Sequence, residues 1–311
     1  MASAVPGDDP HHPRYNIRMF ENFTHRQIET SGAVINLRHG GSGPPVLLLH
    51  GHPQTHVMWH KVAPKLAETY TVVCADLRGY GDSSKPPTTE DHEPYSKRAM
   101  ARDQVEAMQA LGFERFAVVG HDRGGRCAYR MALDHPERIV SLSVLDIIPT
   151  AEHFQRTDMA FAMGYWHWFF LAQPYPIPER LIASDPDVFY LRRGRSLFDE
   201  AALAEYRRCY TDPETVHAMC EDYRAGASID MRLDEDDQKA SRRIACPVQA
   251  LWGRRNGLDR WYDVPAVWRD WADHVEGYSI DCGHYLAEEA PEETLAALEP
   301  FLAKAFARER D

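Results

Sequence analysis

The chain has 311 residues, of which 44% are hydrophobic and 26% are charged, and 35 basic against 47 acidic residues give a formal net charge of -12 at pH 7. No apolar run approaches the ~20 residues that a membrane-spanning helix needs. No basic stripe is present that could neutralise the phosphates of a nucleic acid. We therefore expect neither a membrane segment nor a nucleic-acid partner, and an anionic substrate requires a local arginine cluster to overcome the repulsion.

Residues 1–14 are rich in Pro, Asp and His, and they lack the basic start and apolar stretch of a secretory signal. We expect a disordered tail over residues 1–14 and a cytoplasmic location. The six cysteines are scattered without CxxC pairs. This spacing predicts reduced packing thiols rather than a zinc ribbon or a disulfide framework.

Short β-rich segments alternate with longer helical patterns along most of the chain. Six of them are predicted to be buried parallel strands of a doubly wound sheet, over residues 46–50, 70–76, 116–120, 139–146, 248–252 and 277–281. Apolar spacing predicts helices over residues 97–111, 123–134 and 291–307. After residue 146 the alternation stops, and about a hundred residues rich in aromatics indicate a helical cap inserted over the sheet.

The predicted fold class is therefore α/β, with a mostly parallel, doubly wound sheet and an inserted helical cap. We place the core in residues 15–147 and 239–311 and the cap in residues 148–238. The acidic run at residues 234–237 is predicted to be a solvated surface turn where the cap rejoins the core.

The first predicted strand ends in a His-Gly-His-Pro sequence at residues 50–53, where a backbone N–H can point at a developing oxyanion. Further histidines at residues 56 and 60 could suggest a metal site. No HExxH-like ligand set accompanies them, so we expect no metal.

The third predicted strand runs through a turn into a helix with the pattern GxDxG, at Gly120, Asp122 and Gly124. This is a nucleophile elbow with Asp where an esterase has Ser. The glycines permit a tight turn, and the apex residue is held over the carboxyl edge of the sheet. Taken alone, the pattern also fits an ordinary helix N-cap.

A histidine, His284, follows the last predicted strand and completes the order nucleophile, acid, histidine. With the elbow and the loop at residues 50–53, it makes the chain from about Glu29 to Ala307 resemble the α/β-hydrolase superfamily. The segment at residues 76–84 is typical of that superfamily, and we expect a structural role for it.

An aspartate nucleophile favours displacement at an sp³ carbon, which points to alkyl halides or epoxides. Displacement leaves an alkyl ester on Asp122, and His284 is the predicted base for the water that hydrolyses it. The backbone N–H groups of His52 and Arg123 are expected to bind the oxyanion.

Two acids could orient His284. Asp146 ends the fourth predicted strand, and Asp259 lies in the loop after Trp252. The sequence leaves both open.

Arg123 and Arg126 lie beside the predicted nucleophile at the start of a helix. Two guanidinium groups can hold a substrate carboxylate by charge-assisted, bidentate bonds. In the alternative interpretation, Arg126 pairs with a surface acid and Arg123 merely caps the turn.

The cap segments that start at Tyr165 (Tyr-Trp-His-Trp-Phe-Phe-Leu-Ala-Gln-Pro) and Cys220 (Cys-Glu-Asp-Tyr-Arg-Ala-Gly), with the Asp-Arg-x-x-Arg element at Asp122, resemble fluoroacetate dehalogenases. The resemblance implies a catalytic set of Asp122 as nucleophile, His284 as base and Asp146 as its acid. It further implies a carboxylate clamp of Arg123 and Arg126. The implied halide pocket has three donors to the departing halide, which are His167, Trp168 and Tyr223.

The resemblance implies hydrolysis of haloacetates to glycolate and halide through an aspartyl ester, without a cofactor. The implied partners are a small haloacid substrate and a second copy of the chain in a homodimer. One position departs from the family pattern, which has an aromatic such as Phe where this chain has His52. This change can alter substrate preference without changing the reaction class.

The nearest alternative is an epoxide hydrolase with the same nucleophile and base, in which Tyr223 or another cap tyrosine protonates the epoxide. A neutral epoxide carries no carboxylate that the arginine pair could bind. A haloalkane dehalogenase would prefer an apolar slot over Arg126. A catalytically silent ligand receptor is disfavoured by the complete set of nucleophile, base and acid.

Overall fold

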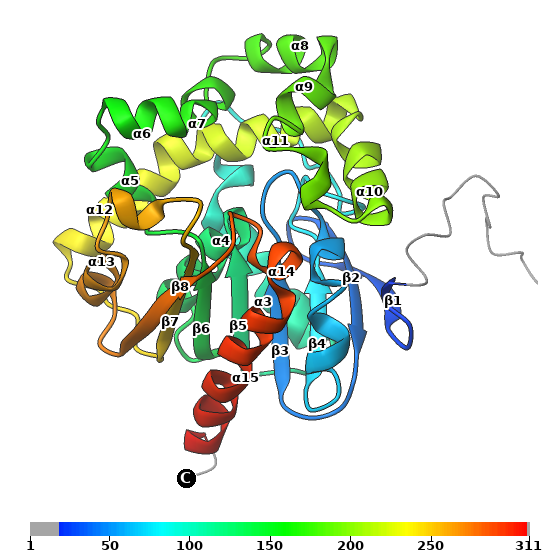
Figure 1. Ribbon diagram of the computed structural model, residues 1–311, viewed down its shortest axis with the longest axis vertical. Helices are drawn as coiled ribbons and strands as arrows, with labels where there is room; N and C mark the ends of the chain where they lie inside the picture. Colours follow the sequence, from blue (N-terminus) through cyan, green and yellow to red (C-terminus); the bar gives the residue numbers. More distant parts are fainter. Residues whose placement is uncertain (1–18, 310–311) are drawn as a thin grey trace, which may run out of the picture.

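The computed structural model describes residues 19–309, so the tail expected over residues 1–14 lies outside the described range. Eight strands form one sheet in the order β1-β2-β4-β3-β5-β6-β7-β8 (Figure 1). Their bounds are Thr24–Glu29, Val34–Gly40, Pro45–Leu49, Thr71–Ala75, Phe116–His121, Ile139–Leu145, Val248–Gly253 and Val275–Ile280 for β1 to β8. The pairings from β4 through β3 to β8 are parallel, whereas β2 is antiparallel to both β1 and β4.

The central strands are apolar because the sheet is covered on both faces. Every residue of β5, β6 and β7 is buried, as are four of the five residues of β3. Such continuous apolar runs are typical of parallel strands between two helical layers. The sheet confirms the predicted α/β class and the six predicted strands, and it adds the antiparallel pair β1 and β2.

The helices of the core alternate with these strands. Helices α3 and α4 pack against each other on one face of the sheet, and α15 lies across the other (Figure 1). The core helices are α2 (Ala63–Leu66), α3 (Lys97–Ala110), α4 (Arg123–Asp134), α13 (Val264–Trp271), α14 (Leu286–Glu289) and α15 (Pro291–Arg308). None of the helices in the described range is long and apolar enough to cross a lipid bilayer.

Between β6 and β7 the chain forms a run of helices that lies over one edge of the sheet (Figure 1). These are α5 (Thr150–Gln155), α6 (Met159–Gly164), α7 (Trp166–Leu171), α8 (Ile177–Ser184), α9 (Pro186–Tyr190), α10 (Glu200–Tyr210), α11 (Pro213–Ala225) and α12 (Met231–Lys239). We refer to α5–α12 as the cap. The exact division of the chain into core and cap at residues 147/148 and 238/239 stays our proposal.

The acidic run at residues 234–237 is part of α12, so the prediction of a solvated surface turn was wrong. Asp234 and Asp237 are buried. Arg130 of α4 donates to Asp234 Oδ1 at 2.7 Å and to Asp237 Oδ2 at 2.5 Å. The buried guanidinium pairs with both carboxylates, and these ion pairs join α12 to the core.

Candidate active site

The predicted nucleophile Asp122 lies between β5 and α4. Its backbone has φ 47° and ψ -114°, a strained conformation for a residue with a side chain. The turn requires glycine nearby, because a Cβ at Gly120 would lie 2.5 Å from the carbonyl oxygen of Gly124. Asp122 is therefore held at the carboxyl end of β5, beneath the cap.

The Asp122 carboxylate is buried among groups that favour its ionised form. The backbone N–H of His52 donates to Oδ1 at 3.1 Å, and His284 Nε2 lies 3.8 Å from Oδ2. Burial by itself raises the pKa of Asp122, but His284, then His121 and the two following arginines, lower it well below its usual range. An ionised carboxylate needs no base to take its proton before it can act as a nucleophile.

The loop that carries the His52 N–H is oriented by His50. The Leu77 N–H donates to His50 Nε2 at 3.1 Å, so the proton of this ring lies on Nδ1, which donates to the Gly51 carbonyl at 2.8 Å. The C=O and N–H of a trans peptide point in opposite directions. The bond from His50 therefore helps to aim the N–H of His52 at Asp122. A Cβ at Gly51 would lie 2.7 Å from Asp122 Cβ, which explains the glycine.

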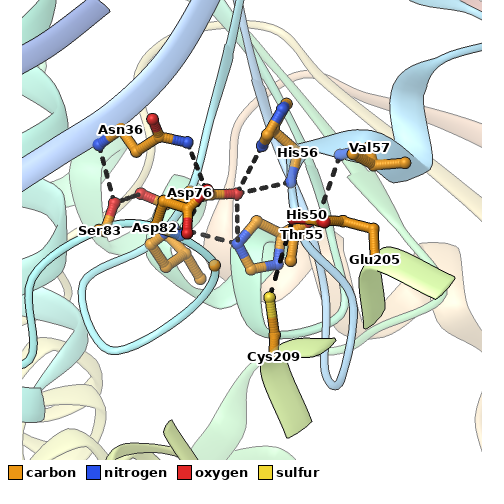
Figure 2. A network of polar contacts seen from close by, with 12 residues as sticks. Asn36, His50, Thr55, His56, Val57, Asp76, Asp82, Ser83, Glu205 and Cys209 are labelled. Atoms are coloured by element: carbon orange, nitrogen blue, oxygen red, sulfur yellow. Dashed lines mark hydrogen bonds and ion pairs between the residues drawn. The ribbon is translucent and has the colours of Figure 1, made fainter. Parts of the chain in front are cut away.

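A buried network around Asp76 holds the rest of this loop (Figure 2). Asp76 Oδ1 accepts from the backbone N–H of His56 at 2.7 Å and lies 2.9 Å from His56 Nδ1. Asp76 Oδ2 accepts from Asn36 Nδ2 at 2.8 Å and from the Asp82 N–H at 3.1 Å (Figure 2). Burial raises the pKa of Asp76, but its contacts with His56 outweigh this effect and lower the pKa below its usual range, so the carboxyl stays ionised. Within residues 19–309 no group of His, Cys, Asp and Glu side chains is arranged to hold a metal ion.

The predicted base and one of its two possible acids are in contact. His284 Nδ1 lies 2.5 Å from Asp146 Oδ2 and donates to it. The other candidate, Asp259, instead accepts from Trp252 Nε1 at 3.0 Å. With its proton on Nδ1, His284 presents an unprotonated Nε2 toward Asp122 and can accept a proton from water.

Asp146 is itself fixed by donors that the sequence did not indicate. Its Oδ1 accepts from the Gly253 N–H at 2.9 Å, and its Oδ2 accepts from Asn256 Nδ2 at 2.6 Å. The Asn256 amide also lies 2.9 Å from the hydroxyl of Tyr165 in the cap. The loop after β7 thus supports the acid rather than supplying it.

The two arginines beside the elbow have different environments. Arg123 pairs with buried Asp222 of α11, with Nε donating at 3.0 Å and Nη2 at 2.5 Å. Arg126 donates from Nη1 to the Ile148 carbonyl and to Thr150 Oγ1, both at 3.1 Å. It forms no salt bridge within residues 19–309, and its buried Nε has no hydrogen-bond partner there.

The alternative in which Arg126 pairs with a surface acid therefore does not hold in this structure. Arg123 is not merely a cap either, because its charge is compensated by Asp222 across the cap interface. Arg126 has no salt-bridge partner in the described residues. Burial and then Arg123 lower its pKa, and among the nearby charged side chains other than tyrosines only Asp122, one turn back along the chain, raises that pKa. Such a buried charge calls for an anionic partner.

The predicted halide donors lie on two cap helices, His167 and Trp168 on α7 and Tyr223 on α11. Trp168 Nε1 and His167 Nδ1 are buried without a hydrogen-bond partner in the described chain. Burial lowers the pKa of His167 and raises that of Tyr223, so both stay neutral. Unpaired buried polar atoms beside a cavity indicate a ligand that forms hydrogen bonds with them.

A small cavity lies between core residues and the cap. Its wall includes the predicted nucleophile, the base and two of the halide donors: Asp122, His284, His167 and Tyr223. The same wall holds His52, Pro53, Tyr165, Arg192, Arg193 and Tyr285. Arg123, Arg126 and Trp168 are not part of this wall. The Arg123 guanidinium lies 4.3 Å from the ring centre of Tyr223 in the wall, and that of Arg126 lies 4.4 Å from the ring centre of Trp168. The space suits only a small substrate.

Several residues of the site have no signal in the sequence. Asp222 lies 99 positions after Arg123, and Asn256 lies 110 positions after Asp146. His121, whose Nε2 contacts the His284 carbonyl at 2.8 Å, also escaped prediction. Pairs of this kind follow from the fold and not from any local pattern.

Residues 44–291 of this chain match the sequence model of a protein family that is described as alpha/beta hydrolase fold. A curated fluoroacetate dehalogenase from Burkholderia sp is 48% identical, covering 92% of this chain and 96% of its own length. A curated soluble epoxide hydrolase from Corynebacterium sp. (strain C12) is 35% identical over 88% of this chain and 95% of its own. A solved protein from Nostoc sp PCC 7120, described as an alpha/beta hydrolase, has a TM-score of 0.88 at 53% identity and covers 90% of this chain and 98% of its own.

Proposed function

This chain belongs to the alpha/beta hydrolase fold family. We propose that it cleaves the carbon–halogen bond of small haloacids and converts haloacetates to glycolate and halide. It is a hydrolase. The observation that carries the proposal of a haloacid substrate is that several buried polar atoms near Asp122 have no hydrogen-bond partner in the described residues, among them Arg126 Nε, His167 Nδ1 and Trp168 Nε1. A haloacid would satisfy them with its carboxylate and its halogen.

In the first step the ionised Asp122 attacks the carbon that bears the halogen. A bond forms between a carboxylate oxygen and that carbon, and the carbon–halogen bond breaks with its electron pair leaving on the halide. The substrate carboxylate pairs with Arg126, with Arg123 behind it. His167, Trp168 and Tyr223 donate hydrogen bonds to the halide, whose charge develops in the transition state.

In the second step a water molecule hydrolyses the resulting ester. His284 Nε2 takes the proton while the water oxygen attacks the Asp122 carboxyl carbon, and Asp146 stabilises the imidazolium. The tetrahedral oxyanion lies against the backbone N–H of His52, and that of Arg123 is the proposed second donor. Collapse of this intermediate breaks the bond between the Asp122 carboxyl carbon and the glycolate oxygen, which takes the proton back from His284. Glycolate leaves, and the new Asp122 carboxyl group loses its remaining proton to solvent to regenerate the carboxylate.

Epoxide hydrolysis is the second candidate, because the hydroxyl-bearing Tyr165 and Tyr223 share a cavity with Asp122. An epoxide hydrolase could use them to protonate the opening ring. A neutral epoxide would leave the charge of buried Arg126 uncompensated, which is costly. The relative with the higher identity is also the fluoroacetate dehalogenase. Both considerations favour the haloacid.

The test is to incubate the protein separately with fluoroacetate, chloroacetate and styrene oxide, and to measure fluoride, chloride, glycolate and diol. We expect halide and glycolate in equal amounts and little diol. Asp122→Asn serves as the inactive control. Diol formation without halide release would replace the proposal by the epoxide hydrolase. A homodimer, a cytoplasmic location and independence of any cofactor remain part of the proposal.

A further inference from the structure

Two arginines that the mechanism does not use, Arg192 and Arg193, line the same cavity as Asp122 and His284. They lie in the segment between α9 and α10, and both side chains are exposed. Neither forms a salt bridge within the described residues. Two uncompensated positive charges therefore lie where the cavity meets solvent.

Both guanidinium groups are held by neutral partners, and both are charged because arginine stays protonated in proteins. Arg192 Nη1 donates to the Phe189 carbonyl at 2.8 Å, and its guanidinium packs 5.0 Å from the ring centre of Phe189 and 5.6 Å from that of Trp166. Arg193 Nη1 donates to Asn256 Oδ1 at 2.6 Å. The positions of the two charges are thus built into the fold, although the side chains reach solvent.

The charge of the whole molecule makes such a site useful. The net charge of -12 repels an approaching anion, and the ionised Asp122 adds negative charge in the wall of the cavity. A cleft lined by charge of one sign raises the local concentration of the opposite ion and speeds its capture. For an anion, Arg192 and Arg193 are the cations met before the buried Arg126.

We propose that Arg192 and Arg193 form an entrance site for carboxylates, which captures a haloacid from solvent and passes it to the deeper Arg126. That the anion is a haloacid rests on the proposed function. The entrance site should govern capture of the substrate and not the chemical steps. Removal of the entrance site should therefore mainly raise KM. This rise should become smaller as salt screens the charges.

Arg192 is the better residue to test, because Arg193 also contacts Asn256, which supports Asp146. Arg195 provides a matched control. It lies three residues further along the same segment, pairs with Asp187 at 2.6 Å and does not line the cavity. Arg192→Gln and Arg195→Gln change the net charge equally, so any difference between them reflects position.

Glycolate formation from chloroacetate should be measured for wild type, Arg192→Gln and Arg195→Gln at low and high NaCl. We expect Arg192→Gln to lose about tenfold in kcat/KM at low salt, through KM. The loss should shrink to about twofold at 0.5 M NaCl, where the Debye length is only a few ångström. Arg195→Gln should stay close to wild type at both salts. Equal behaviour of the two variants, or a loss that salt does not reduce, would overturn the entrance site.

Acetate binding separates this proposal from the proposed function, because it needs no turnover. Isothermal titration with acetate at low salt should show weaker binding to Arg192→Gln than to wild type or Arg195→Gln. If wild type forms no glycolate from any haloacetate, the proposed function fails, yet this ranking would still support an entrance site for carboxylates. Identical acetate affinities in the three proteins would refute it.

Discussion

At the scale of single residues, Asp122 and His284 serve different steps of the proposed reaction. Displacement needs only the carboxylate, the clamp and the halide donors, whereas ester hydrolysis needs a base. We therefore expect His284→Asn to form the ester and fail to clear it. It should release about one equivalent of halide per site and then stop. Intact-protein mass spectrometry should detect a carboxymethyl adduct, which peptide mapping should assign to Asp122.

The absence of an adduct, while wild type turns over under the same conditions, would mean that water attacks the substrate directly or that another residue is the nucleophile. Turnover of wild type in H₂¹⁸O separates these cases. The ester route introduces the label into the Asp122 side chain, and direct attack does not.

Arg126 is predicted to hold the substrate carboxylate, because its charge has no carboxylate partner in the described chain. Arg126→Leu should lower kcat/KM for chloroacetate by about 10- to 100-fold, as expected for loss of a charge-assisted bond of about 1.5–3 kcal/mol. Arg126→Lys should recover part of this loss, because it keeps the charge without the planar fork. A folded Arg126→Leu variant with the wild-type kcat/KM would exclude the clamp.

Trp168 is predicted to assist fluoride more than chloride. Its buried Nε1 has no partner in the described residues, and fluoride, with its concentrated charge, gains most from each hydrogen bond. Trp168→Phe should therefore reduce fluoride release from fluoroacetate more than chloride release from chloroacetate. Equal losses for the two substrates would indicate packing damage alone.

At the scale of helices and strands, a buried carboxyl connects α14 to the cap. Glu288 of α14 accepts from Tyr206 of α10 at 2.9 Å and from the Gln54 amide. Burial raises the pKa of Glu288 to about 8, so the group is protonated in the folded protein at neutral pH. The unfolded chain, with an ordinary glutamate pKa near 4.3, has already lost this proton.

Between these two pKa values the folded protein binds more protons than the unfolded chain, so the stability due to Glu288 falls as pH rises and is lost above pH 8. Glu288→Gln should remove this decline while keeping the polar contacts. The free energy of unfolding of Glu288→Gln, measured by urea titration from pH 6 to 8, should fall less steeply than that of wild type. The two slopes should differ by up to about 1.4 kcal/mol per pH unit. Exposed Glu292→Gln is the control, and parallel slopes for all three proteins would contradict the prediction.

The elements that the sequence predicts well are those with a strong apolar pattern. The strands β5, β6 and β7 are buried throughout and were predicted to within about a residue. The antiparallel strand β1 was missed because five of its six residues are exposed, which leaves no apolar face to recognise. The acidic run in α12 was misassigned because its partner, Arg130, lies about a hundred residues earlier.

The same reasoning explains which parts of the candidate site were predictable. The elbow at Asp122 follows from local spacing, since the glycines and the strand adjoin it. The choice between Asp146 and Asp259 depends on how two loops meet in space, and only the structure brings Asp146 to His284. Likewise, no local signal marks Arg192 as a cavity residue.

At the scale of the whole molecule, the cap is joined to the core through the buried carboxylate of Asp222 on α11. It accepts from Arg123 of α4, from the Tyr80 hydroxyl at 2.7 Å, and from Lys97 of α3. Burial raises the pKa of Asp222, but Arg123 and Lys97 lower it well below its usual range. One ionised group thus pairs with two buried cations and joins α11 to α3 and α4.

Asp222→Asn should therefore destabilise the protein strongly, because it leaves Arg123 and Lys97 buried without a counter-charge. Removal of one partner of a buried ion pair typically costs about 3–5 kcal/mol, and we expect a loss of that order in the free energy of unfolding by urea. Asp236→Asn, on the exposed face of α12, makes the same chemical change without a buried partner and should leave stability almost unchanged. Because Arg123 also packs against Tyr223 of the cavity wall, the Asp222 variant should lose kcat/KM on chloroacetate together with stability. Equal stability of the two variants would mean that the cap is held by its apolar contacts, and that the carboxylate only positions Arg123.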